Sequence, residues 1–233
     1  SLKVNASLTY NRQYTDKYLK RGYGPTNYLY NLILWTGPDI GVSDLRNYWR
    51  PGQEGLQQRH YNVSWYNNSY FQAYEYLRGY YRDNVFGQVK LDYNVAPALD
   101  LALRTGLNQY RLDRSYKEPK SYVAYDYISN GNYGLLNENS LNLNTDFIAA
   151  YNKQLSDNIA LRVSVGGANR WRQFQSAFVK TDGLVIPGFF HLSNTQNPLQ
   201  GIDRFDPTNL RDSKQEEKVN SVYGTLDLEL WNS

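Results

Sequence analysis

The stretch VFGQVKLDYNVAPALDLALRTGL, residues 85–107, decides the fold because it holds two alternating segments joined by a few turn residues. In both segments apolar side chains occupy every second position, and charged or polar side chains such as Lys90 and Arg104 occupy the positions between them. This period of two is that of a β-strand. Pro97 falls between the segments, where it breaks the pattern. The stretch therefore predicts a β-hairpin.

The same alternation recurs along the chain. It predicts further strands over residues 2–10, 141–151, 159–167 and 222–230. The strands are joined alternately by long polar connections, at 11–84, 109–140 and 168–221, and by short turns, at 94–98 and 152–158. Each predicted strand has about 9 to 11 residues, which is the length that a tilted strand needs to cross a bilayer.

Composition narrows the class of protein. The chain of 233 residues has no run of apolar residues long enough for a membrane-spanning helix, and it has no Cys for disulfides, zinc clusters or thiol nucleophiles. Its net charge of +3 comes from scattered Lys and Arg, so it has no basic stripe of the kind that binds nucleic acid. The mean hydropathy of −0.70 does not decide between a soluble protein and a membrane barrel, whose loops are polar.

The order of long and short connections favours a membrane barrel. In an up-and-down antiparallel sheet it places every long connection at one end and every short turn at the other, as in outer-membrane barrels with long extracellular loops and short periplasmic turns. A soluble β-sandwich also alternates and remains the alternative. Six strands would leave two unpaired edges in lipid, so we expect residues 1–233 to be one part of a barrel whose other strands lie outside this sequence.

The alternation also assigns the two faces of the predicted barrel wall. Charged side chains on the inward face must meet water or a polar plug, and we expect apolar side chains near the middle of the outward face to meet lipid. The expected lumen-facing residues are Lys90, Asp92, Arg104, Asp146, Arg162, Asp227 and Glu229. The expected lipid-facing residues are Leu91, Leu103, Phe147, Val163 and Leu228.

Three segments resemble one family. They are NLILWTGPDIGVSDLRNYWRPGQEGLQQ (31–58), NNSYFQAYEYLRGYYRDNVFGQVKLDYN (67–94) and LALRTGLNQY (101–110). In this order they resemble the central barrel region of SusC-like, RagA-type, TonB-dependent outer-membrane transporters. The resemblance implies a barrel of about 22 strands with an N-terminal plug. It also implies a SusD-like surface lipoprotein that delivers oligosaccharides or peptides, and coupling to the TonB complex through a plug region that would precede Ser1.

Candidate catalytic and metal-binding residues are few, and we predict no enzyme. His60 and His191 are far apart and lack the partners of a catalytic triad or a metal site. Asp203, Asp206 and Asp212 are possible ligands for Ca²⁺, but their spacing is not that of a calcium loop, and turn formation accounts for them. We therefore expect no cofactor.

Aromatic residues are concentrated in the first long connection. Their rings suit stacking on sugars or anchoring a partner protein, or they pack the connection against itself. The contact candidates are Trp35, Trp49, Trp65, Tyr48, Tyr70 and Phe71.

Three functions follow from these observations. The first is an energy-coupled importer with a surface lipoprotein partner, in the outer membrane of a Gram-negative bacterium. The second is a passive porin or structural barrel, which connections of this length would obstruct. The third is a soluble glycan-binding sandwich, which needs a second sheet over the apolar face.

Overall fold

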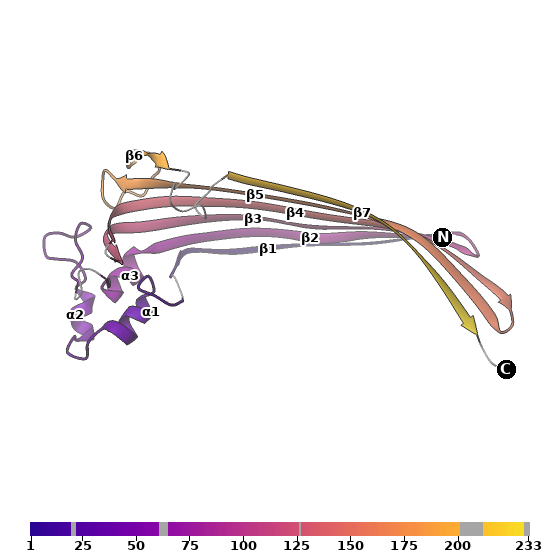
Figure 1. Ribbon diagram of the computed structural model, residues 1–233, viewed down its shortest axis with the longest axis horizontal. Coiled ribbons are helices and arrows are strands. Elements are labelled where there is room, and N and C mark those ends of the chain that lie inside the picture. Colours follow the sequence, from indigo (N-terminus) through magenta and orange to yellow (C-terminus); the bar gives the residue numbers. More distant parts are fainter. Residues whose placement is uncertain (20–21, 61–64, 126, 201–211, 231–233) are drawn as a thin grey trace.

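The computed structural model describes residues 1–19, 22–60, 65–125, 127–200 and 212–230, and these form one long antiparallel sheet with a small helical segment at one end (Figure 1). The strands are β1 (Leu2–Tyr18), β2 (Leu77–Ala96), β3 (Leu99–Ala124), β4 (Tyr127–Ser156), β5 (Ile159–Leu184), β6 (Thr195–Gln200) and β7 (Asp212–Leu230). The short helices are α1 (Tyr28–Tyr30), the π-helix η1 (Asn31–Trp35), α2 (Val42–Arg46) and α3 (Ser69–Glu75). The prediction of an all-β, antiparallel sheet is confirmed.

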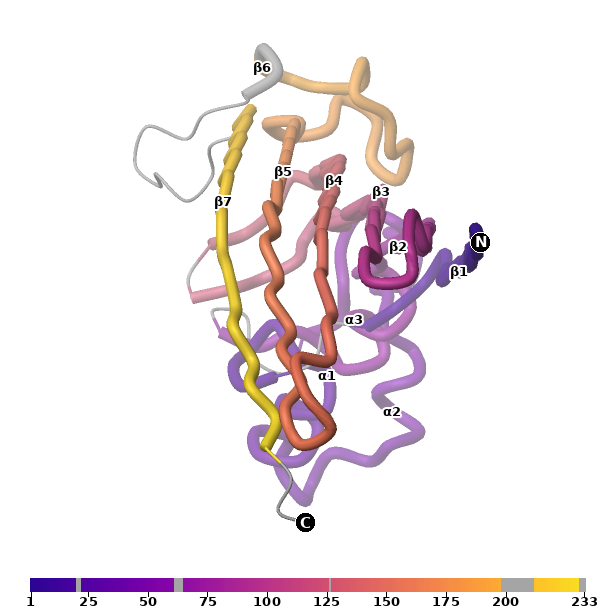
Figure 2. Tube along the Cα trace, turned by 90° about the vertical axis from the view of Figure 1, so that its right-hand side faces the viewer, coloured from indigo at the N-terminus to yellow at the C-terminus, as the bar shows by residue number. Residues whose placement is uncertain are grey.

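The seven strands of the sheet follow the chain order from β1 to β6, and β7 pairs with β5 as well. The two strands pair with different parts of β5: β6 pairs with its last residues, 180–184, and β7 pairs with residues 159–177. The sheet is curled rather than flat, with β1 at one edge and β7 at the other (Figure 2). It therefore has the form of an incomplete barrel wall.

The strands are much longer than the alternation of apolar residues predicted. The expected connection 109–140 is almost wholly a strand hairpin, because β3 pairs with β4 from Leu99↔Tyr151 to Ala124↔Tyr127. Likewise β5 continues to Leu184 and β7 begins at Asp212, which shortens the expected connection 168–221. These two predictions were wrong. Beyond Gln109 both faces carry polar groups, so the contrast that marks a strand in sequence disappears.

The short turns lie at the end of the sheet opposite the helices (Figure 1). Pro97 and Ala98 join β2 to β3, and Asp157 and Asn158 join β4 to β5. Both fall inside the predicted turns 94–98 and 152–158.

The first connection is shorter than the predicted 11–84, because β1 continues to Tyr18 and β2 begins at Leu77. We call residues 22–60 and 65–76 of this connection the cap. Asparagine side chains start two of its helices: the Asn27 side chain accepts from the backbone N–H groups of Leu29 and Tyr30, and that of Asn68 accepts from those of Tyr70 and Phe71. Such N-caps satisfy amide groups that have no partner within the helix.

Buried amide side chains fasten the cap to the end of β3. Asn67 donates from Nδ2 to the carbonyl oxygen of Val123 (2.7 Å) and accepts from its N–H at Oδ1 (2.8 Å), so it replaces a missing strand partner. Gln58 donates from its backbone N–H to Ser121 Oγ (2.8 Å) and from Nε2 to the Ser121 carbonyl (2.6 Å). Because these side chains are almost completely buried, their hydrogen bonds hold the cap in one position at this end of the sheet.

Candidate functional site

The register of the sheet places the expected lipid-facing residues together. Leu91 pairs with Leu103, and Leu103 pairs with Phe147. Directly paired residues point to the same side of a sheet, and alternate residues of one strand do too. Because Tyr151 pairs with Val163 and Leu161 pairs with Leu228, all five expected residues share one face, which we call the apolar face.

The expected lumen-facing residues share the opposite face, which we call the polar face. Arg104 pairs across the strands with Lys90 on one side and Asp146 on the other, and Arg162 pairs with Asp227. Arg104 forms a two-pronged ion pair with Asp146, with both N–O distances at 3.0 Å. Lys90 binds Asp92 at 2.9 Å, and Glu229 lies opposite Ala160. Which of the two faces meets lipid stays a prediction.

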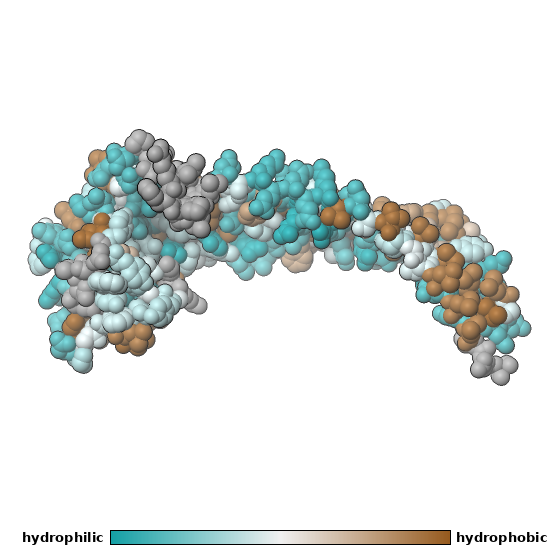
Figure 3. Space-filling view, viewed as in Figure 1, coloured by the Kyte–Doolittle hydropathy of each residue, from teal (hydrophilic) through white to brown (hydrophobic). Residues whose placement is uncertain are grey.

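The apolar face is apolar over only part of its length. Side chains from Leu99 to Leu107 on β3 cover about 30 Å at about 3.3 Å per residue. Farther along, the same face carries ion pairs, between Arg12 and Asp83 (2.7 Å) and between Arg111 and Asp113 (3.1 Å). Figure 3 shows the hydrophobic residues gathered toward the short-turn end, with hydrophilic residues over the middle of the sheet. Nine residues is thus about the length that a tilted strand needs to cross a bilayer core, and the strands continue beyond it.

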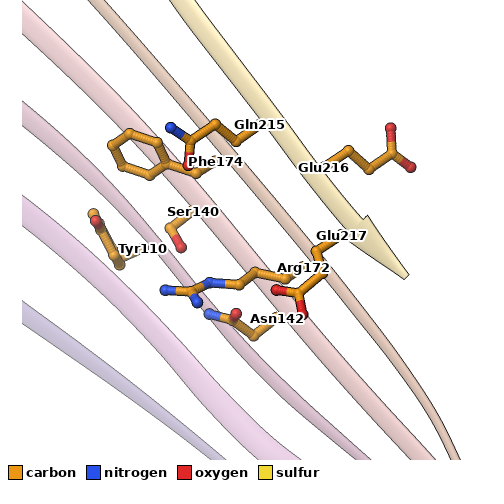
Figure 4. Close-up of a pocket in the computed structure, with 8 residues that line it drawn as sticks. All are labelled: Tyr110, Ser140, Asn142, Arg172, Phe174, Gln215, Glu216 and Glu217. Atoms are coloured by element: carbon orange, nitrogen blue, oxygen red, sulfur yellow. The ribbon is translucent and has the colours of Figure 1, made fainter. Parts of the chain in front are cut away.

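A hollow of about 560 Å³ lies on the polar face, farther from the short turns than the apolar band. Its lining comes from β3, β4, β5 and β7 and consists of Tyr110, Ser140, Asn142, Arg172, Phe174, Gln215, Glu216 and Glu217. Figure 4 shows Arg172 extending across β4 in the direction of Tyr110, whereas Glu216 is turned away. Glu216 instead accepts from Trp171 Nε1 at 2.9 Å. The hollow is polar and open, which suits a hydrated ligand better than an apolar one.

Arginine and tyrosine alternate beside this hollow, and sequence analysis missed them. On β2 the polar face carries Arg78, Tyr80 and Arg82, which pair with Tyr116, Arg114 and Leu112 of β3. Assigning residues 77–84 to a connection hid this pattern. The available signal was the period of two in RGYYR (78–82), which has the same periodicity as the neighbouring strand.

The three tryptophans named as contact candidates occupy different places in the cap. Trp35 stacks on Tyr66 at 5.0 Å between ring centroids, and Trp65 meets Tyr125 edge-on at 5.5 Å. Trp35 and Trp65 remain 47% and 43% exposed. Trp49 packs edge-on against Phe71 at 5.2 Å and is half-buried. Trp35 and Trp65 therefore offer the more accessible rings.

The other aromatic candidates contribute chiefly to packing. Phe71 is completely buried, so it presents no surface to a ligand and its assignment as a contact residue is wrong. Tyr70 stacks on Tyr74 at 6.2 Å. Tyr48 stacks on Tyr74 at 6.1 Å and donates to Glu75 at 2.9 Å. Burial raises the pKa of Tyr48 to about 12, with the hydrogen bond to Glu75 adding to it, so the phenol stays protonated at neutral pH.

The two histidines have different surroundings. Burial in the cap lowers the pKa of His60 to about 4, so its imidazole is neutral at pH 7. The ring of His191 is held locally, with Nδ1 2.7 Å from Ser193 Oγ.

Among the described residues no three His, Cys, Asp or Glu side chains cluster as ligands for a metal ion. Of the proposed calcium ligands, Asp203 and Asp206 lie outside the described residues, and Asp212 begins β7. No helix in the described part of the chain is long and apolar enough to cross a membrane.

Comparison with solved structures identifies the architecture. The chain matches the RagAB peptide importer in its open-open state with a TM-score of 0.65, and in its closed-closed state with a TM-score of 0.61. Each match has 13% sequence identity and covers 98% of this chain and 24% of that one. The fold is that of a segment of a RagA-type barrel. It spans about a quarter of the matched chain.

The match agrees with the barrel fold that the family resemblance implied. No family model matches the chain, and no curated protein sequence matches it. The evidence for the shared fold is therefore structural similarity. Because the sequence identity is only 13%, the substrate and the partners have to be argued from the residues of this chain.

Proposed function

We propose that this chain forms part of the barrel wall of a SusC-type importer in the outer membrane of a Gram-negative bacterium. The observation that carries the proposal is the apolar band, about 30 Å long when measured along the strands, on one face of a sheet that matches a segment of an importer barrel. The charged side chains on the other face fit a water-filled or plugged lumen.

The proposed substrate is an oligopeptide or oligosaccharide delivered by a SusD-like surface lipoprotein. The matched structures are of a peptide importer, which favours peptides. The cap lies beyond the apolar band, at the end of the sheet opposite the short turns, where a surface partner would bind (Figure 1). Exposed Trp35 and Trp65 supply aromatic anchors there, and such anchors contribute more to interfaces than exposed charge pairs do.

A passive porin is the second candidate, since it would share the apolar band. The buried hydrogen bonds from Asn67 and Gln58 argue against it, because they fix a folded segment at the mouth of the wall. A wide open pore has no need of such a segment. Energy coupling through a TonB complex and a plug belongs to the importer proposal.

The experiment that separates the two functions measures uptake of a labelled oligopeptide by cells that express the full-length protein. Uptake should depend on this protein, and it should stop when an uncoupler collapses the proton-motive force. A mutant lacking the lipoprotein partner should take up less. Uptake that continues unchanged with the uncoupler would identify a passive pore, and cells that take up equal amounts without the protein would exclude both functions.

A further inference from the structure

The polar face carries three arginines that are less exposed than the arginines that form ion pairs. The arginines at 12, 104, 111 and 170 each form an ion pair, and their side chains are between 52% and 65% exposed. Arg78, Arg82 and Arg114 are less exposed, yet none of them forms an ion pair with a described residue. Removing a cation from water without a counter-charge is unfavourable, so the less exposed arginines are the ones expected to have ion-pair partners. Their lack of such partners requires an explanation.

Contacts with tyrosine rings supply part of the explanation. The guanidinium carbon of Arg82 lies 4.4 Å from the ring centroid of Tyr110, and that of Arg114 lies 5.5 Å from the centroid of Tyr80. The guanidinium carbon of Arg78 lies 5.3 Å from the centroid of Tyr116. These contacts orient flat cations against flat rings and leave the edges of the guanidinium groups available. We call these six residues the Arg–Tyr cluster.

The hydrogen-bonding groups of the cluster are not all used. The Nε atoms of Arg78, Arg82 and Arg114 are buried and have no hydrogen-bond partner. Within the described part of the chain these three side chains donate one hydrogen bond, from Arg78 Nη2 to Tyr76 Oη at 2.9 Å. Buried donors normally have partners, so these Nε atoms leave the charge of their guanidinium groups uncompensated. The Nη groups of Arg82 and Arg114, which have no hydrogen-bond partner among the described residues and are not buried, are the donors left for a ligand that supplies acceptors.

Carboxylates of the chain itself do not fill this role in the described residues. Glu118, on the same face of β3, accepts from Ser129 Oγ at 2.6 Å and from Asn132 Nδ2 at 2.8 Å. Glu138 pairs with Leu112, which separates it from Arg82, and it forms no ion pair with a described residue. The cluster therefore keeps an excess of positive charge.

The cluster adjoins the hollow described above, because Tyr110 belongs to both. Arg172, Asn142 and Ser140 continue the hollow with further donors. A ligand with one anionic group at the cluster would thus place its remainder along a polar, open surface.

We propose that the Arg–Tyr cluster binds carboxylate groups of the substrate as it passes along the lumen wall. Guanidinium groups match carboxylates in planar, two-pronged geometry, and each pairing replaces an unused donor with a charge-assisted hydrogen bond. The class of substrate is a carboxylate-bearing oligomer, and an acidic peptide is the form that the importer fold favours. This inference rests on the proposed function, since it takes the polar face as the lumen.

The test uses the purified full-length importer and two short labelled peptides, one of alternating Asp and Gly and one with Asn in place of Asp. Fluorescence anisotropy should show that the acidic peptide binds at least about tenfold more tightly, and that added salt reduces the difference. The double variant Arg82→Gln/Arg114→Gln should bind both peptides equally. The matched control Arg111→Gln, on the opposite face of β3, should keep the preference.

Folding is checked by urea titration of each variant, and Arg82→Lys/Arg114→Lys provides a second variant that keeps the charge. The lysine variant should retain part of the preference, because lysine lacks the two-pronged geometry. Equal binding of both peptides by the unmodified protein, or an undiminished preference in the glutamine variant, would overturn the inference and leave the importer proposal standing. Failure to bind either peptide would count against peptide import itself. An acidic oligogalacturonide as a third probe then shows whether the carboxylate comes from a sugar.

Discussion

Substitution of Leu103 by arginine tests the assignment of the apolar face. Leu103 is the middle residue of Leu99–Leu107, and its neighbours across the sheet are Leu91 and Phe147. The nine residues cover about 30 Å along the strand, or about 21 to 25 Å across the membrane at a tilt of about 35–45°. This places Leu103 near the bilayer midplane.

Arginine at the midplane of a barrel's lipid face costs about 2 to 4 kcal/mol, so we expect Leu103→Arg to lower the free energy of unfolding by about 3 kcal/mol. The assay is a reversible guanidinium titration of the full-length barrel in phospholipid bilayers. The control is Gln88→Arg, because Gln88 is exposed on the polar face and lies opposite Gly106. We expect the control to change stability by less than about 1 kcal/mol. A larger loss in Gln88→Arg than in Leu103→Arg would refute the assignment.

Three further predictions concern the cap. Asn67→Ala removes the hydrogen bonds from Asn67 to the buried N–H and carbonyl of Val123, which should destabilise the docked cap by about 2 to 4 kcal/mol. The cap should then become the first site of proteolysis in outer-membrane vesicles. The control Asn47→Ala, at an exposed asparagine, should leave proteolysis of the cap unchanged. Because the pKa of His60 is lowered to about 4 while the unfolded value is near 6.5, the unfolded cap binds more protons between these values. Cap stability should therefore fall by about 2 to 3 kcal/mol as pH falls from 6.5 to 4, which hydrogen exchange would measure. The variant His60→Gln should remove this pH dependence. Alanine at both Trp35 and Trp65 should weaken co-purification of the lipoprotein partner while the barrel still folds. The control Tyr14→Ala, on the apolar face of β1, should leave co-purification unchanged. Unchanged retention of the partner in the double tryptophan variant would show that both tryptophans serve packing only.

The sequence was informative where one face of a strand differs from the other. Between Leu99 and Leu107 apolar and polar side chains alternate, so strand, hairpin and faces followed from the pattern alone. Farther along β3 the apolar face holds Arg111 and Asp113, while the polar face holds Tyr110 and Arg114. A period of two is invisible when both faces are polar, although the backbone pairing continues unchanged.

The cap was beyond sequence analysis for a different reason. Its helices have at most seven residues, too few for a helical period to show. Its attachment to β3 depends on single buried side chains, Asn67 and Gln58, whose partners are about 56 to 63 residues away. Polar residues in a connection usually indicate exposure, and only the fold reveals that these form a buried network.

The face assignment along β3 is the central claim, and nitroxide scanning of the full-length protein in bilayers tests it most directly. Spin labels are placed one at a time from residue 99 to residue 115, and collisions with oxygen, which concentrates in lipid, are compared with collisions with a water-soluble nickel complex. We predict that accessibility alternates strongly from residue to residue over 99–107, with oxygen collisions favoured at Leu101, Leu103 and Thr105. On the same apolar face, collisions with nickel should be favoured from Arg111 onward. Nickel accessibility at Leu101 and Leu103 equal to that at Arg111 would contradict a membrane-embedded wall.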